Sequence, residues 1–116
     1  MKFANFFDAL EDSARPLVME ALGVDAACPV CRAELSARVR GAFRAGNRVK
    51  CTPCGWRGTW HDGTILKRSR LSASQFLFLS ALIRFSDDNR QIAEFIGVDP
   101  DTVRAWRVIL AEVARD

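Results

Sequence analysis

The chain contains four cysteines, and they are arranged in two pairs of the form Cys-x-x-Cys. The first pair is Cys28 and Cys31, and the second pair is Cys51 and Cys54. A Cys-x-x-Cys turn directs both sulfurs towards one point, and two such turns separated by nineteen residues supply the ligands of a closed tetrahedral zinc site. Four thiolates leave no coordination position for water or substrate. The spacing therefore predicts one structural zinc ion rather than a catalytic one.

Other uses of the cysteines agree less well with the sequence. Disulfides need an oxidising compartment, whereas the first residues include Asp8, Glu11 and Asp12 and no continuous apolar run of the kind found in secretion signals. A redox motif would explain the first pair and leave the second without a role. Iron in the same four-thiolate site is the alternative that the spacing leaves open. We expect a cytoplasmic protein without a membrane span.

Positive charge is concentrated in the part of the chain that contains the cysteines. The 116 residues carry a formal charge of +3, but residues 28–71 hold ten basic and two acidic side chains. Residues 1–27 and 72–116 carry net charges of −3 and −2. A zinc ion with four thiolates contributes a formal −2, so the middle part stays strongly cationic. Such a block predicts contact with the phosphates of a nucleic acid.

The residues before the first cysteine, 1–27, predict a helical segment. Phe3, Phe6 and Phe7 recur with helical spacing and place their rings on one face. We interpret this stripe as core or as a subunit contact. Because proline is poorly tolerated inside a helix, we expect a break before Pro16 and a second short helix up to residue 22.

Residues 28–66 predict a zinc ribbon, which is a small antiparallel sheet with the two cysteine turns at one end. We expect three short strands. The first covers residues 35–43, the second covers residues 48–50 after a turn at residues 46–47 and leads into the second cysteine turn, and the third carries Trp56 and Trp60. The two indoles are interpreted as core rather than as base-stacking groups. A sheet of this size buries too little surface to fold alone, so the metal is expected to hold it together.

Residues 67–116 predict a basic linker followed by three helices. A capping-box pattern at residues 72–75 opens an apolar helix, and residues 90–96 form a second, short helix that ends at a glycine turn. Asp99 is placed to cap a third helix that starts at Pro100. This pattern is typical of a helix-turn-helix. The predicted fold class is therefore α+β, with a zinc ribbon between an N-terminal helical segment and a trihelical helix-turn-helix.

The order of these motifs resembles the N-terminal DNA-binding region of insertion-sequence transposases that carry a zinc ribbon. The likeness spans residues 28–112 and includes the cysteine pairs, the segment Asp62-Gly63-Thr64-Ile65-Leu66 after the tryptophans, and the helical pattern from Gln91 to Trp106. Such transposases continue into a nuclease domain, whereas this sequence ends at Asp116. We therefore expect a binding module without catalysis.

The resemblance implies that the helix beginning at Pro100 enters the major groove of double-stranded DNA. Arg104 is the expected base-reading residue with Asp101 beside it, and Arg107 and Arg90 are expected near phosphates. Because this part of the chain is net acidic, we expect the ribbon and the linker to supply most phosphate contacts. The side chains assigned to that role are Arg38, Arg40, Arg44, Lys67, Arg68 and Arg70.

These inferences favour a sequence-specific DNA-binding protein, specifically a small transcriptional regulator of phage or mobile-element origin. The alternative is an adaptor that docks on RNA polymerase or a transposase through its apolar and acidic helical surfaces. His61 is the only histidine, and no serine or spare cysteine completes a catalytic set with it, so we expect no enzyme. The sequence leaves open whether the chain forms a homodimer.

Overall fold

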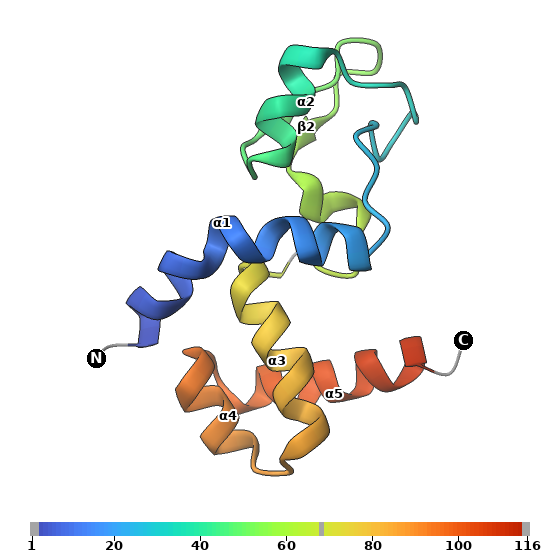
Figure 1. Cartoon of the computed structure of the whole chain (residues 1–116). Helices are drawn as coiled ribbons and strands as arrows, with labels where there is room; N and C mark the ends of the chain where they lie inside the picture. The colour runs from blue at the N-terminus through green and yellow to red at the C-terminus, as the bar shows by residue number, and fades with distance from the viewer. Residues whose placement is uncertain (1–2, 68, 115–116) are drawn as a thin grey trace. The chain divides into compact units, whose positions relative to one another are not determined.

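The computed structural model describes residues 3–67 and 69–114, and the side chains of residues 5–67 and 69–113. This part of the chain is α+β, with five α-helices and one two-stranded antiparallel sheet (Figure 1). None of the described helices combines the length and apolarity needed to cross a membrane. The chain divides into two compact units. We call residues 12–71 the cysteine unit, and the residues up to Glu11 together with those from Ser72 onward the helical unit.

The helical unit contains the start of α1 (Phe3–Ala21) and the helices α3 (Ala73–Phe85), α4 (Asn89–Ile96) and α5 (Pro100–Ala114). Helices α3, α4 and α5 pack against one another (Figure 1). Their shared core includes Leu79, Ile96 and Val103, each with at most 1% of its surface exposed. The ring of Trp106 packs edge-on against Phe76 at a centroid distance of 5.5 Å.

The predicted capping box opens α3. The Ser72 hydroxyl accepts a hydrogen bond from the Gln75 backbone N–H at 3.2 Å, and the Gln75 side chain accepts one from the Ser72 N–H at 3.0 Å. A carboxylate from α1 completes the helix start. Glu11 accepts hydrogen bonds from the N–H groups of Ala73 and Ser74 at 3.0 and 2.9 Å, and from the Ser74 hydroxyl at 2.9 Å. Together these side chains pair the donors that the first turn of a helix leaves without intrahelical partners.

The phenylalanine stripe of α1 belongs to this core. Phe7 is buried, and its ring lies edge-on to Phe78 and Phe95 at centroid distances of 5.4 and 5.5 Å. Phe6 also packs on Phe78, at 5.5 Å. The core interpretation is confirmed for these two rings, whereas the side chain of Phe3 lies outside the described part.

Helix α1 continues through Pro16, and the predicted break is wrong. The proline removes one backbone hydrogen bond and costs about 3 kcal/mol inside a helix. Its neighbours Ala14, Val18 and Met19 lie on one face and are all buried. Burial of that face on both sides of the proline offsets its cost and keeps one helix of 19 residues.

The cysteine unit contains α2 (Ala37–Arg44), β1 (Val49–Lys50), β2 (Arg57–Gly58) and the 3-10 helix η1 (Trp60–Gly63). The strand predicted at residues 35–43 is wrong, because that segment is mostly α2. Its buried and half-buried apolar side chains, Val39 and Phe43, are four residues apart and follow the helical period. The Ser36 hydroxyl caps the helix by accepting from the Val39 N–H at 3.4 Å.

The second predicted strand is found as β1, whereas the third is shorter than predicted. It ends at Gly58, and η1 begins at Trp60, whose side chain is 1% exposed. Thr59 turns the chain, since its hydroxyl accepts from the His61 N–H at 3.4 Å. The described sheet therefore has two strands of two residues each, although Trp60 has the predicted core role.

Replacing Glu11 by glutamine tests the contact that closes the start of α3. Hydrogen bonds to a charged acceptor contribute about 1.5–3 kcal/mol, so we expect E11Q to lower the free energy of unfolding by about 2 kcal/mol in urea denaturation. Glu20 is an exposed carboxylate of the same helix, and E20Q is the matched control. Equal stability of E11Q and E20Q would contradict this role of Glu11.

Candidate metal centre

The four cysteine sulfurs form one cluster. The Cys28 and Cys54 sulfurs are 3.6 Å apart, the Cys31 and Cys51 sulfurs are also 3.6 Å apart, and all four lie within 4.8 Å of one another. Zinc–sulfur bonds of about 2.3 Å in a tetrahedron place neighbouring sulfurs roughly 3.8 Å apart. The four predicted ligands are therefore positioned to hold one metal ion.

The two cysteine turns have the same backbone hydrogen bonds. In the first turn, the Arg32 N–H donates to the Cys28 carbonyl at 3.0 Å, and the Cys28 N–H donates to the Ala33 carbonyl at 2.9 Å. In the second turn, Gly55 donates to Cys51, and Cys51 donates to the carbonyl five residues further on, both at 2.7 Å. The fold thus builds each half of the site from one repeated local structure.

The residue after the second cysteine of each turn is left-handed. Gly55 has φ 80°, as expected for glycine, whereas Arg32 adopts φ 65° with a full side chain. A left-handed conformation costs a residue with a Cβ about 1–2 kcal/mol. In this conformation the Arg32 N–H donates to the Cys28 carbonyl, which is the bond that Gly55 makes to Cys51 in the second turn.

Backbone N–H groups and neighbouring thiols set the ionisation of the cluster. Burial raises the pKa of Cys28, but hydrogen bonds from the N–H groups of Cys31 and Val30 and from neighbouring thiols lower this pKa overall to about 6. The Cys54 N–H lowers the pKa of Cys51, yet burial and the other three thiols raise this pKa to about 12. A cation bound among these sulfurs would favour the thiolate form and so oppose the rise in the pKa of Cys51.

The segment after the second turn is fixed by side-chain contacts. The Trp56 indole N–H donates to the Asp62 carboxylate at 3.1 Å. Gly58 lies beneath this pair, and a Cβ there would be 2.0 Å from the Asp62 oxygen and 2.8 Å from a Trp56 ring carbon. A larger residue here would have to displace the Asp62 carboxylate or the Trp56 ring from this contact.

His61 packs inside the cysteine unit and is not a member of the sulfur cluster. Its ring stacks on Trp60 at a centroid distance of 4.1 Å. Its Nδ1 lies 3.1 Å from the Thr59 hydroxyl, and its Nε2 lies 3.3 Å from the Leu71 carbonyl oxygen. His61 thus lies within η1, whose caps are Thr59 and Thr64, and its ring is half-buried.

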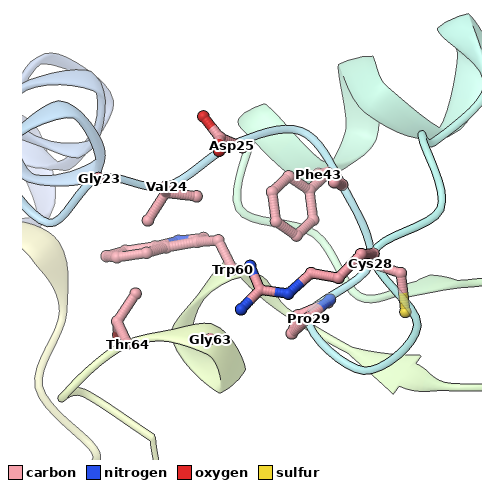
Figure 2. A pocket seen from close by; sticks show the side chains of 11 residues that line it. Gly23, Val24, Asp25, Cys28, Pro29, Phe43, Trp60, Gly63 and Thr64 are labelled. Atoms are coloured by element: carbon pink, nitrogen blue, oxygen red, sulfur yellow. The ribbon is translucent and has the colours of Figure 1, made fainter.

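A pocket of about 230 Å³ lies beside the first cysteine turn (Figure 2). Val24, Phe43 and Trp60 line its apolar part, and Asp25 and Arg32 line its polar part. Its volume is below the range of about 300–1,000 Å³ that is usual for small-molecule sites. We therefore treat it as a surface hollow next to the cluster.

The residues predicted to contact phosphates lie on two segments of the cysteine unit. Helix α2 carries Arg38 and Arg44, which are exposed, and Arg40, whose guanidinium lies 3.6 Å from the Glu34 carboxylate. The remaining ones follow η1, and they are Lys67 and Arg70, both exposed, and Arg68, which lies outside the described residues.

The residues predicted on the last helices have different roles. Arg90 is exposed near the start of α4. Arg104 is exposed on α5, and its guanidinium lies 2.5 Å from the Asp101 carboxylate one turn earlier. Arg107 is half-buried, and it donates hydrogen bonds to the Asn89 side chain at 2.6 Å, to the carbonyl of residue 83 at 3.1 Å and to that of residue 86. Arg107 therefore ties the end of α3 to α4 and α5, a structural role that the sequence pattern does not reveal.

Three exposed cations on or beside the hairpin were not named among the predicted contacts. They are Arg48, directly before β1, Lys50 on β1 and Arg57 on β2. The alternation of Arg48, Val49 and Lys50 is a sequence signal for two cations on one side of a strand. Their partner Arg57 could not be found without the register of the hairpin.

Comparison of this chain with protein families, with curated proteins and with solved structures finds no match. Its function is therefore inferred from its own residues.

The strain at Arg32 gives a test of the cysteine turns. R32G relieves the left-handed backbone and R32A does not, while both remove the same guanidinium. After allowing for the greater freedom of glycine in the unfolded chain, we expect R32G to be more stable than R32A by about 1 kcal/mol in urea denaturation. Equal stability of the two variants would show that the first turn is not strained.

Proposed function

We propose that this protein binds DNA and that a structural zinc ion in the four-cysteine site fixes the surface that contacts the phosphates. The observation that carries this proposal is the exposure of the cations around the site. Of the basic residues that the structure describes between Cys28 and Leu71, all except Arg40 are exposed. Two acidic residues accompany ten basic ones in this stretch. An exposed, one-signed surface of this kind attracts a polyanion through counterion release.

Zinc is the metal that best suits the four cysteines. Thiolate ligands favour soft or borderline metals, and four of them close the coordination sphere. The site is next to a hairpin of two residues per strand, which is too small to be stable alone. The ion would therefore act by holding the cationic surface in shape.

We further propose that α4 and α5 form a helix-turn-helix that reads the major groove. Gly97 ends α4 in a left-handed conformation with φ 89°, and α5 begins three residues later at Pro100. Arg104 would read a guanine after leaving its ion pair with Asp101. An exposed ion pair is worth about 0.2–1 kcal/mol, whereas a good bidentate base contact gives about 1–3 kcal/mol of discrimination. The exchange is therefore favourable at a matching site.

Two functions are thus divided between the two units. The cysteine unit would supply affinity that depends on salt, and the helical unit would supply sequence preference. A small transcriptional regulator of phage or mobile-element origin would use this combination to occupy a site without cutting it. This biological role rests on the motif order, which resembles the DNA-binding part of transposases.

An adaptor function is the second candidate, and one observation favours it. Phe85, at the end of α3, is 85% exposed. The stripe on α1 does not add to such a docking surface, because Phe7 is buried. A chain that binds no duplex at low salt and retains RNA polymerase or a transposase through Phe85 would replace the DNA-binding proposal.

Binding over a potassium chloride series tests the division between the units. Duplexes are first selected from a random pool with the zinc-loaded chain. We expect the variant R38Q/R40Q/R44Q to reduce the log–log salt slope by about 0.9 for each phosphate that is no longer neutralised, on any sequence. R104Q should lower the affinity for the selected site roughly 5- to 150-fold and leave the affinity for random duplexes unchanged.

R84Q is the matched control, since Arg84 is an exposed arginine of α3 outside both proposed surfaces. An unchanged slope in the triple variant would refute the phosphate role of α2. Loss of all binding in R104Q alone would refute the division of labour.

Metal analysis tests the structural zinc. We expect one zinc per chain and no iron in the purified protein, and loss of the zinc in C28S. A chelator should remove the ion, unfold the cysteine unit as seen by circular dichroism, and abolish DNA binding until zinc is restored. DNA binding that survives complete chelation would show that the metal does not support the binding surface.

A further inference from the structure

The hairpin of the cysteine unit places two cations directly opposite each other. Strands β1 and β2 are antiparallel, with Val49 opposite Gly58 and Lys50 opposite Arg57. In the next pair along the ladder, the Cys51 N–H donates to the Trp56 carbonyl at 2.7 Å. The ladder alternates, so Lys50 and Arg57 occupy the non-hydrogen-bonded position, where opposite side chains come closest.

The two faces of the hairpin differ. Val49 and Gly58 are buried, whereas Lys50 and Arg57 are exposed, and the exposed Arg48 precedes β1. Like charges directly opposite in an antiparallel pair are destabilising. The hairpin therefore carries a repulsion that its two short strands do little to offset.

None of these three cations has a carboxylate partner within the described ranges. The ion pairs found there join Arg15 with Asp12, Arg40 with Glu34, and Arg104 with Asp101. An anion from outside would bridge Lys50 and Arg57 and turn their repulsion into attraction. A phosphate suits the pair, since arginine binds its oxygens as a planar fork and lysine binds them as a point charge.

The cysteines hold this pair in place. Lys50 is followed directly by Cys51, and Arg57 follows the turn that contains Cys54. A metal bound by both cysteines would fix the two strands at one end and therefore the spacing of the two cations. Pre-organisation of this kind reduces the entropy that two long side chains lose on binding.

We propose that Lys50 and Arg57 together grip one phosphate of the DNA backbone, with Arg48 beside them. This inference rests on the proposed DNA binding and assigns to it a contact point outside α2 and the linker. The pair lies on a metal-anchored hairpin, so it would set where the backbone sits rather than add only diffuse charge.

The test uses the full, zinc-loaded chain and a random-sequence duplex over a potassium chloride series. The variants are K50Q, R57Q and the double variant, with R84Q as the matched control. We expect either single substitution to reduce the log–log salt slope by about 0.9, because the shared phosphate is released. The double variant should reduce the slope no further. R84Q should keep the slope of the unmodified chain.

Thermal unfolding without DNA gives an independent readout. K50Q and R57Q should each raise the melting temperature of the zinc-loaded protein relative to R84Q, because each relieves the repulsion across the hairpin. The proposal that both cations bind one phosphate would be overturned if the slope reductions of K50Q and R57Q add fully in the double variant. It would also be overturned if both single variants have lower melting temperatures.

Two further arms separate rival explanations. Inorganic phosphate, exchanged for chloride at constant ionic strength, should stabilise the unmodified chain more than K50Q/R57Q. Such stabilisation combined with an unchanged salt slope of duplex binding in K50Q/R57Q would show that the ligand is free phosphate and that the DNA contact is wrong. Zinc content should be equal in all variants, because its loss would show that the cations serve the thiolate site instead.

If the unmodified chain binds duplex and the hairpin variants behave like R84Q, this inference alone fails. If the unmodified chain binds no duplex, the proposed function fails.

Discussion

The convergence of four sulfurs on one point is the constraint on which the cysteine unit depends. In the described part of this unit four residues are in strands, and a hairpin of that size has little stability in water. The two turns, with their matched backbone bonds, bring segments 26 and 20 residues apart to within 3.6 Å at the sulfurs. Burial of Phe43, Trp60 and Leu66 then completes a small core beside the cluster. A cation bound by the four sulfurs would favour the Cys51 thiolate, whose pKa is otherwise raised, and would couple metal binding to the folding of this unit.

The two units differ strongly in net charge. Residues 12–71 carry a net +6, and the remaining residues carry −3. In the helical unit, part of the basic count has an internal use, since Arg107 donates to the end of α3 and Arg104 is paired with Asp101. The helical unit therefore offers less free positive charge than its composition suggests. This asymmetry is the physical reason to assign salt-dependent affinity and sequence preference to different units.

Features set by local spacing can be predicted from the sequence, and features set by tertiary packing cannot. The cysteine ligands and the Ser72 capping box depend on residues a few positions apart, and both are found as expected. The strand prediction for residues 35–43 fails because alternating arginines imitate the period of a strand, whereas Val39 and Phe43 pack with the period of a helix. The predicted break at Pro16 fails because its cost is local, while the burial that offsets it depends on the rest of the unit. The Lys50–Arg57 pair is hidden in the sequence for a similar reason, as register joins residues that the sequence separates.

Helix α1 contributes its first residues to the helical unit and its later residues to the cysteine unit. The boundary between the units at Glu11 and Asp12 therefore falls inside a continuous helix rather than in a loop. The second boundary, between Leu71 and Ser72, comes before the start of α3 and lies outside the described helices. A gene rearrangement that moved either unit alone would divide a helix and expose apolar side chains on both sides of the cut. The two units are accordingly expected to be inherited together, as one piece.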